Sequence, residues 1–397
     1  MTNMTTRAMI TSLAALAFAA AAVPAGATPV CTAPAKLVQF PTAAPVWEMC
    51  LLTPSQSSGN DGSGIEIRDA YYNGHKVFKR AHNPVLNVKY VSGSPCNCYR
   101  DWIDEERKFQ VVTAISNPNP LDCGAGGPGN VECPSNVPGN YAETIVPPVT
   151  VCTSGSHFDI PNTVGFRGVA AEKLADRMIL TTQLAAGWYR YYISWTFYTD
   201  GKVEPRFGFG TTSNSCVNCC GHRHHAYWRF DFDIDDPAND LIGAPPDATH
   251  PRAVIAQENM RNLPDAVKTP PFAVYDSVSR RGYSVVPGQE NIDSPVGSSP
   301  NAGGPFWHGV QYPFDVTDAF MFKYHESGGV PLEINDNAGL GNCALTTTFL
   351  DFDNDEMLNN NGDVVLWYRG GGFHNSGALD TCVVVGPTLY PLGDWTP

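Results

Sequence analysis

The most regular alternation of side chains along the chain runs from Cys216 to Asp236, in the segment CVNCCGHRHHAYWRFDFDIDD. Successive side chains of a β-strand point to opposite faces, so every second residue shares a face. One face begins with two histidines and continues with apolar residues: His222, His224, Ala226, Trp228, Phe230, Phe232 and Ile234. The other face carries Tyr227, Arg229, Asp231, Asp233 and Asp235. The pattern predicts a strand that is apolar on its histidine side and acidic behind.

Similar alternating segments flank this strand. Residues 65–91 contain Asn73-Gly74, a dipeptide typical of tight hairpin turns, and predict two or three antiparallel strands. Residues 178–210 predict a hairpin with its turn near Asp200-Gly201. Strand patterns return in residues 315–332 and 363–368. The last of these leads to His374 through three consecutive glycines, which predict a flexible connection.

Between these strands, residues 115–150, 237–252 and 284–306 are rich in proline and glycine and predict long loops. One helix is predicted, over residues 252–263. Abundant aromatic residues and only 16% charged residues favour strands over helices. With no internal repeat and no clear linker, the chain predicts one all-β domain over residues 28–397, a large antiparallel β-sandwich with long loops and disulfides.

The N-terminus has the pattern of a secretory signal. Arg7 precedes a mostly apolar run from Met9 to Val23, and Ala25-Gly26-Ala27 is a small-x-small cleavage signature. We therefore predict a signal peptide over residues 1–27 and a secreted, extracellular or periplasmic location. No later window is as long and apolar as the roughly 20 residues of a membrane span, so no membrane partner is expected.

Composition adds two constraints. Asp and Glu outnumber Lys and Arg by 39 to 25, and the net charge of -14 becomes -15 without Arg7. Such an acidic surface argues against nucleic acid as a partner. All 12 cysteines follow the predicted cleavage site, and an even number in an exported chain predicts disulfides, at most six of them.

His222 and His224 on one strand face form half of a metal site, and a third ligand has to come from elsewhere. Among the ten histidines, His374 is the best candidate because it follows the strand-like VVLWY segment. Three imidazoles with an open position suit copper or zinc. Two alternatives stay open: His374 as a surface-loop residue, and a zinc site made of the adjacent histidines with Cys216, Cys219 and Cys220.

These residues are similar to those of a known family, the copper-containing quinone amine oxidases. The family's copper strand reads His-x-His, four residues, then Arg-x-Asp-x-Asp-x-Asp, and this chain matches with His222, His224, Arg229, Asp231, Asp233 and Asp235. The segment DVVLWYRGGGFH resembles the one that supplies the third copper histidine, which implies His374. The resemblance covers most of residues 60–375 and lacks the family's smaller N-terminal domains.

The resemblance also implies a cofactor and a catalytic base. The segment GWYRYYISWTF resembles the one whose tyrosine is oxidised to topaquinone, and the matching residue is Tyr189. Its neighbours are Trp188 and Arg190, where the family has asparagine and an acidic residue. The segment RDWIDEE resembles the base segment and nominates Asp104, which would remove the α-proton of the amine.

The acidic side of the copper strand implies a second, harder metal. Asp231 and Asp233 match the family's peripheral calcium ligands, and Asp363 matches a third carboxylate on the strand that leads to His374. Calcium prefers several oxygen ligands, which neighbouring strands can supply. The alternative is an acidic edge that is paired with arginine or solvated.

The leading hypothesis is a secreted copper-dependent enzyme that oxidises a primary amine with O2 to an aldehyde, releasing hydrogen peroxide and ammonia, through a topaquinone derived from Tyr189. The alternative is a copper-binding β-sandwich protein that has lost quinone formation and amine oxidase activity. A third hypothesis is an extracellular binding module whose histidines serve only structure. Because the family is typically dimeric, the resemblance also implies a homodimer.

Overall fold

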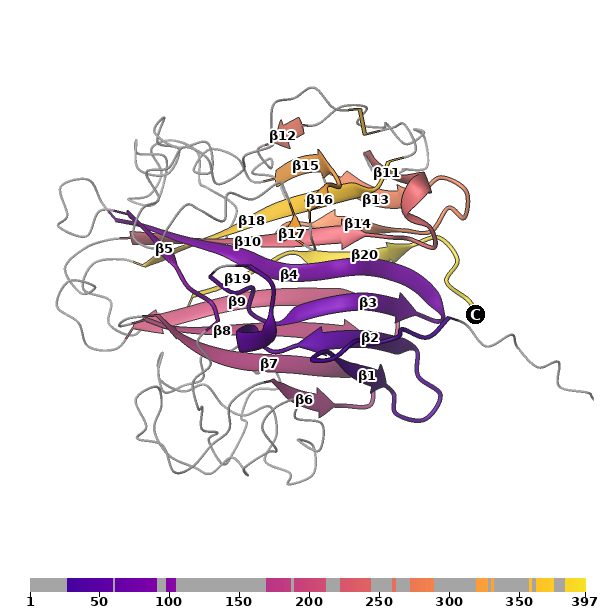
Figure 1. The fold of residues 1–397 in the computed structure, drawn as a ribbon, viewed down its shortest axis with the longest axis horizontal. Helices are drawn as coiled ribbons and strands as arrows, with labels where there is room; N and C mark the ends of the chain where they lie inside the picture. The colour runs from indigo at the N-terminus through magenta and orange to yellow at the C-terminus, as the bar shows by residue number, and fades with distance from the viewer. Residues whose placement is uncertain are drawn as a thin grey trace, which may run out of the picture.

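The computed structural model describes residues 27–59, 61–90, 98–104, 169–186, 189–211, 222–243, 259–261, 272–288, 319–327, 330–331, 357–358, 362–374 and 383–397. In these residues the regular elements are β-strands and two short 3-10 helices, Pro54–Gln56 and Pro237–Asn239 (Figure 1). None of the described segments forms a helix that is long and apolar enough to cross a membrane. The predicted signal peptide lies outside the described residues, except for residue 27.

Among the described residues, nine strands form the first antiparallel sheet. They are β1 (Lys36–Phe40), β2 (Trp47–Leu52), β3 (Glu66–Tyr72), β4 (His75–Tyr90), β5 (Cys98–Asp101), β10 (His222–Phe232), β12 (Asn259–Arg261), β15 (Ala319–Lys323) and β18 (Val364–His374). Their spatial order is β1-β2-β3-β4-β10-β18-β15-β12, and β5 also pairs with β4. The predicted copper strand, β10, therefore lies between β4 and β18 (Figure 1).

A second sheet in the described part of the chain also has nine strands. They are β6 (Ala170–Lys173), β7 (Arg177–Ala186), β8 (Tyr189–Tyr198), β9 (Val203–Thr211), β11 (Asp240–Gly243), β13 (Phe272–Asp276), β14 (Gly282–Val286), β19 (Val383–Val385) and β20 (Thr388–Leu392). The order is β11-β13-β14-β20-β9-β8-β7-β6, with β19 also paired to β9. The short strands β16 (Glu326–Ser327) and β17 (Val330–Pro331) pair with each other.

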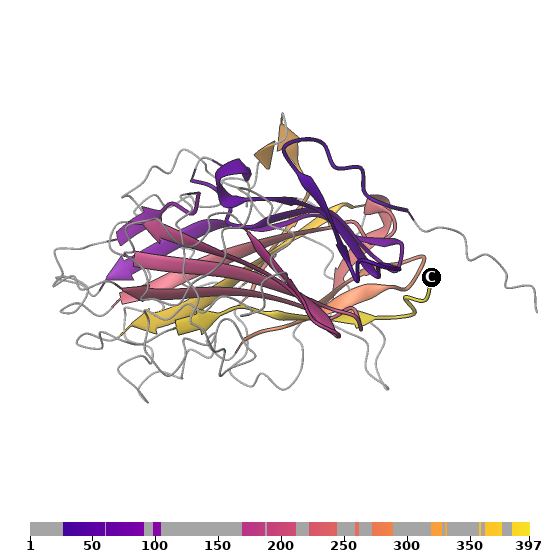
Figure 2. The same cartoon turned by 90° about the horizontal axis from the view of Figure 1, so that it is seen from below.

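The two sheets form two layers around a shared apolar core (Figure 2). The side chains of β10 that face this core are those of the predicted apolar face, Ala226, Trp228, Phe230 and Phe232, and Ile234 continues them beyond the strand. On β8 the inward residues are Tyr191, Ile193, Trp195 and Phe197. Trp195 and Phe230 join the two layers, with ring centroids 6.1 Å apart. The prediction of an all-β antiparallel sandwich is confirmed.

The opposite face of β10 carries the predicted charged residues and is buried. Tyr227, Arg229 and Asp231 are each at most 1% exposed, and a second apolar cluster that includes Tyr227 and Trp367 covers this side. The alternation correctly placed the charged residues on one face. It carried no information about what packs over them.

The predicted turns have a clear backbone cause. Asn73 and Gly74 join β3 to β4, and both have positive φ, 50° and 80°. Two consecutive positive φ values are what a tight hairpin turn with right-handed strand twist requires. Gly201, with φ of 88°, lies in the connection between β8 and β9 where the second turn was predicted.

Two local predictions are wrong. The glycines before His374 continue strand β18 and pair with β10, so they are not a flexible connection. A Cβ atom at Gly370 would lie 2.6 Å from the ring of Trp228, and glycine is there for that close approach. In the region of the predicted helix, Asn259–Arg261 is strand β12, which pairs with β15. The other residues of that helix lie outside the described part of the chain.

One disulfide joins described residues, Cys31 to Cys50, and it fixes the segment before β1 to strand β2.

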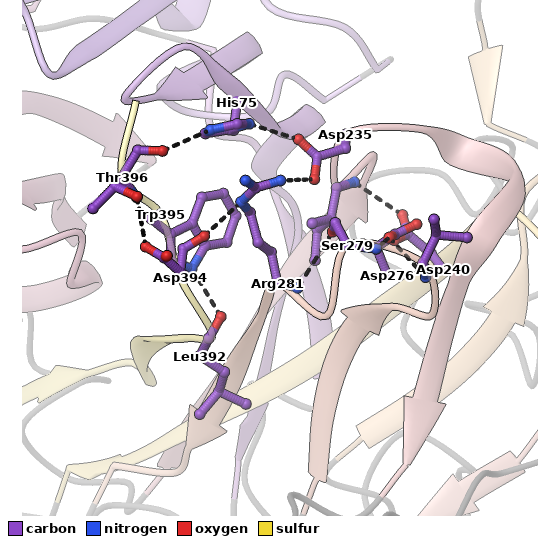
Figure 3. Close-up of polar contacts among 12 residues, drawn as sticks. His75, Asp235, Asp240, Asp276, Ser279, Arg281, Leu392, Asp394, Trp395 and Thr396 are labelled. Atoms are coloured by element: carbon purple, nitrogen blue, oxygen red, sulfur yellow. Dashed lines mark hydrogen bonds and ion pairs between the residues drawn. The ribbon is translucent and has the colours of Figure 1, made fainter.

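The C-terminal segment packs against the sandwich (Figure 3). Arg281 donates to a carboxylate oxygen of Asp235 and to the backbone carbonyl of Asp394, both at 2.7 Å. Next to it, the buried indole of Trp395 packs against Tyr72, His75 and Tyr283.

We predict that Trp395→Ala lowers the free energy of unfolding by about 3 kcal/mol, the usual cost of removing a large buried aromatic side chain. Urea unfolding followed by tryptophan fluorescence measures the change. Tyr390→Ala is the matched control, because Tyr390 is 45% exposed and its removal should cost at most about 0.5 kcal/mol. Equal losses in the two variants would show that the C-terminal segment does not contribute to the core.

Candidate functional site

The three predicted copper residues lie at one end of two neighbouring strands. In the register of β10 with β18, His222 is directly opposite His374, and His224 is opposite Gly372. Directly paired residues of antiparallel strands have Cα atoms about 4.5–5.5 Å apart. Residues 222 and 374, which are about 150 positions apart in the sequence, are therefore neighbours in the sheet. The donor set is chemically suitable for copper, since imidazole is a good ligand for that metal.

His224 is fully buried and lies on the inner face of β10, toward the second sheet. Its Nε2 atom is 3.1 Å from the hydroxyl oxygen of Tyr191 on β8. The two rings meet edge to face, with centroids 5.4 Å apart and an angle of 74° between their planes. This contact connects the histidine end of the first sheet with the strand that begins at Tyr189.

The same hydroxyl of Tyr191 donates a short hydrogen bond to Oδ2 of Asp101. Asp101 is the last residue of β5 and pairs with Leu86, which in turn pairs with Ala226 of β10. Burial raises the pKa of Asp101 to about 7, and the hydrogen bond from Tyr191 acts in the opposite direction. One phenol therefore joins a half-buried carboxylate to a predicted copper ligand.

The two predicted catalytic residues occupy different surroundings. Tyr189 begins β8, where its backbone is opposite Thr211, and it lies two residues, or about 7 Å of strand, from Tyr191. Asp104 lies beyond the end of β5, beside the turn at Gly62: a Cβ atom at that glycine would be 2.5 Å from Cβ of Asp104. The neighbouring Ile103 donates its backbone N–H to the carbonyl of Asp61 at 2.7 Å.

Sequence reasoning missed Asp101 and Tyr191 as members of this site. Asp101 is in the segment RDWIDEE from which Asp104 was chosen, and only its pairing with β4 shows which face of the sheet it takes. For Tyr191 a signal was present, because it shares a strand face with Tyr189 in the predicted alternation. Its contact with His224 is made between the sheets and leaves no trace in the spacing.

The predicted calcium residues meet at the other end of β10. One carboxylate oxygen from each of Asp231, Asp233 and Asp363 lies within 4.8 Å of the others. Each residue also has a cationic neighbour: Arg229 Nη1 is 3.2 Å from Asp231, Lys76 Nζ is 2.7 Å from Asp233, and Lys79 Nζ is 4.0 Å from Asp363. The arginine-paired alternative therefore describes one of the three carboxylates, Asp231, whose ion pair with Arg229 is buried.

The electrostatics of this carboxylate cluster favour an additional cation. Burial, followed by repulsion from Asp231 and Asp233, raises the pKa of Asp363 to about 8. Burial also raises the pKa of Asp233 despite the neighbouring Lys76. The Oδ1 atoms of Asp233 and Asp363 are buried and accept no hydrogen bond. A divalent ion bound by oxygen would relieve both the repulsion and the unmet acceptors.

We predict that Asp363 lowers the stability of the metal-free protein as pH rises from about 4 to about 8. Asp363 has a pKa of about 8 when folded and about 4 when unfolded, so in this window the folded state binds more protons. Asp363→Asn should make stability less dependent on pH, with the clearest gain near pH 8. Urea unfolding in a metal chelator measures both effects, and an unchanged pH slope in the variant would contradict the assigned repulsion.

Two solved structures share this arrangement of strands. The copper-containing benzylamine oxidase from Hansenula polymorpha matches with a TM-score of 0.53 and 14% identity, over 88% of this chain and 59% of that protein. An amine oxidase from Aspergillus nidulans matches with a TM-score of 0.50 and 14% identity, over 87% and 50%. The chain thus spans between half and three fifths of these proteins' lengths. No family model matches the sequence, and a search of curated proteins finds no match. At this identity the likeness shows the fold, a β-sandwich similar to that of copper amine oxidases.

Proposed function

We propose that this protein is a copper-dependent oxidase of primary amines. The observation that carries the proposal is the pairing of His222 with His374, two residues from the buried His224, in a sandwich with the fold of copper amine oxidases. In this proposal the three histidines hold the copper. Export of the protein, on the N-terminal signal pattern, and a homodimeric state belong to the same proposal.

Tyr189 is the proposed precursor of the quinone. It stands on the strand that faces the histidines, because Tyr191 of the same strand contacts His224. When present, copper and the quinone supply an electron sink that takes two electrons from the amine and returns them to O2. The overall reaction converts the amine, O2 and water into an aldehyde, hydrogen peroxide and ammonia.

The residues of this chain have two tasks around that chemistry. The buried inner face excludes water from the region of His224. A carboxylate has to accept the α-proton of the amine, because a carbon acid this weak needs a positioned base. Two aspartates close to the end of β5, Asp101 and Asp104, are the candidates for this role.

The carboxylate cluster of Asp231, Asp233 and Asp363 is proposed as a calcium site with a structural task. It lies at the opposite end of β10 from the histidines, about 30 Å away along the strand. A cation there would stabilise the ends of β10 and β18, and would therefore stabilise the register that brings the histidines together.

Reconstitution of the metal-free protein with copper in air tests the oxidase proposal. We expect one copper per chain, a visible quinone band, and a hydrazine adduct on the peptide that contains Tyr189. His224→Ala should lose the copper and the band, whereas Tyr189→Phe should keep the copper and lose the band. Elemental analysis, absorbance and peptide mass spectrometry give the three readouts.

His75→Ala serves as the matched histidine control, because His75 lies at the far end of the fold beside Asp235 and Thr396 (Figure 3). It should leave copper binding intact. Stoichiometric copper without an adduct would contradict the oxidase and support a copper-binding β-sandwich protein without quinone. Copper binding that survives His224→Ala would contradict the assigned site.

Calcium should stabilise the protein by about 2.7 kcal/mol at a concentration 100 times the dissociation constant, since a ligand that binds only the folded state shifts unfolding by mass action. Asp363→Asn should abolish this gain. Asp236→Asn is the control, because Asp236 is exposed and lies outside the carboxylate cluster. Thermal unfolding with calcium or with a chelator measures the effect. Equal stabilisation of the two variants by calcium would contradict the proposed site.

A further inference from the structure

We propose that the phenol oxygen of Tyr191 is a fourth ligand of the copper ion, in addition to His222, His224 and His374. The inference rests on the proposed copper site and adds to it a residue of the second sheet. It follows from the distance between the Tyr191 hydroxyl and His224, from the direction of the hydrogen bonds at that hydroxyl, and from the donor atoms that copper prefers.

The hydroxyl of Tyr191 lies next to a nitrogen of a proposed copper ligand. His224 belongs to β10 of the first sheet and Tyr191 to β8 of the second, and both side chains are fully buried. The phenol oxygen is 3.1 Å from Nε2 of His224. A metal ion bound at this nitrogen would therefore lie beside the phenol oxygen, in the space between the two sheets.

The same distance suits two ligand atoms of one ion. Nitrogen and oxygen donors bind a first-row metal such as zinc at about 2.0–2.1 Å, so two donors at an angle of about 90–110° are about 2.8–3.4 Å apart. The observed 3.1 Å lies within this range. Strands β8 and β10 thus already hold the two atoms at the separation of neighbouring metal ligands.

The hydrogen bonds at Tyr191 direct an oxygen lone pair toward His224. The phenol has a single proton, which it donates to Oδ2 of Asp101. The contact with His224 therefore uses a proton on Nε2, which the phenol oxygen accepts. A metal ion between the two atoms takes the place of that proton, because a ring nitrogen must lose its proton to bind a metal.

Copper binding requires two proton movements and no change in oxidation state. At His224 the proton leaves Nε2 and the ring stays neutral with its proton on Nδ1, so that Nε2 binds the metal. At Tyr191 the O–H bond breaks, and the proton passes to Oδ2 of Asp101 along the existing hydrogen bond. The oxygen then binds copper as a phenolate. The metal enters and remains as Cu(II).

The charge of a phenolate suits a copper ion at this depth. Three neutral imidazoles leave both positive charges of Cu(II) uncompensated in a buried site, and a buried charge is costly without a partner. One phenolate lowers that net charge. Nitrogen and oxygen donors in a tetragonal arrangement are typical of Cu(II), whereas softer sulfur ligands select Cu(I). Tyr191 therefore favours the oxidised metal.

The surroundings of Tyr191 hold it in place for this role. Its backbone pairs with Leu184 of β7 and with Phe209 of β9, so it is on an inner strand of the second sheet. Its ring packs on Phe207, with centroids 5.2 Å apart. With histidines from β10 and β18 and a phenolate from β8, the metal would join the two layers of the sandwich.

The test uses the full chain with Tyr189→Phe, which cannot form the proposed quinone. Loaded with Cu(II) under argon, this variant should bind one copper and show a visible charge-transfer band from phenolate to Cu(II). Resonance Raman spectra excited in that band should contain phenolate ring vibrations. Adding Tyr191→Phe should remove the band and the vibrations while the three histidines still bind one copper.

Tyr283→Phe, added to Tyr189→Phe, is the matched control. Tyr283 is also fully buried, but its hydroxyl donates to the carbonyl of Gly201 at 3.1 Å. This variant should keep the band. A second measurement leaves the ligand in place: 3-fluorotyrosine incorporated only at position 191 should shift the band to shorter wavelength, because fluorine draws electron density from the phenolate.

The outcomes separate this inference from the proposed function. Copper that binds the Tyr189→Phe protein without the band overturns the ligand role of Tyr191 and leaves the oxidase standing, and so does a band that survives Tyr191→Phe. If the variant with both changes binds no copper, the shift with 3-fluorotyrosine decides. A band in Tyr189→Phe but no hydrazine adduct in the wild type overturns the oxidase and leaves the ligand. Wild-type protein that binds no copper overturns both.

Discussion

The register between β10 and β18 is the constraint on which the rest of this structure depends. One antiparallel ladder places His222 opposite His374 at one end. Its last pair at the other end is Asp231 with Val365. Asp233 and Asp363 each lie two residues beyond that pair. A slip by one residue would turn every side chain of the slipped strand to the other face and would separate both groups at once. The close packing of Gly370 on the ring of Trp228 leaves no room for a side chain at this position of the ladder. The histidine and carboxylate ends are therefore specified by a single strand pair.

The burial of β10 on both faces costs free energy, because one of these faces carries charged side chains. Arg229 and Asp231 are buried together, 3.2 Å apart, and a buried charge without its partner would cost several kcal/mol. The negative charge around Asp363 is less well compensated, because three carboxylates meet there. Burial and their mutual repulsion raise the pKa of Asp363. Imbalance of this kind is common at functional sites.

Much of this fold could be predicted from the sequence, because alternation with a period of two determines strand faces directly. The inward residues of β8 and β10 and the turn at Asn73-Gly74 follow from that rule and from the chemistry of positive φ. The glycines of β18 could not be read in the same way. A glycine run signals flexibility when the chain is considered alone, and becomes a strand only because Trp228 of the neighbouring strand occupies the space of the missing side chain.

The choice between Asp101 and Asp104 shows the same limit at the level of chemistry. The resemblance of RDWIDEE to the family's base segment nominated Asp104, but the same segment also contains Asp101 three residues earlier. Only the ladder from Asp101 through Leu86 to Ala226 determines that Asp101 faces the core, and only the second sheet supplies Tyr191 to hold it. The carboxylate of Asp101 lies between two sheets, and one strand places it while a strand of the other sheet orients it. A sequence motif can indicate the strand that carries such a residue. The contact with the other sheet is known only from the structure.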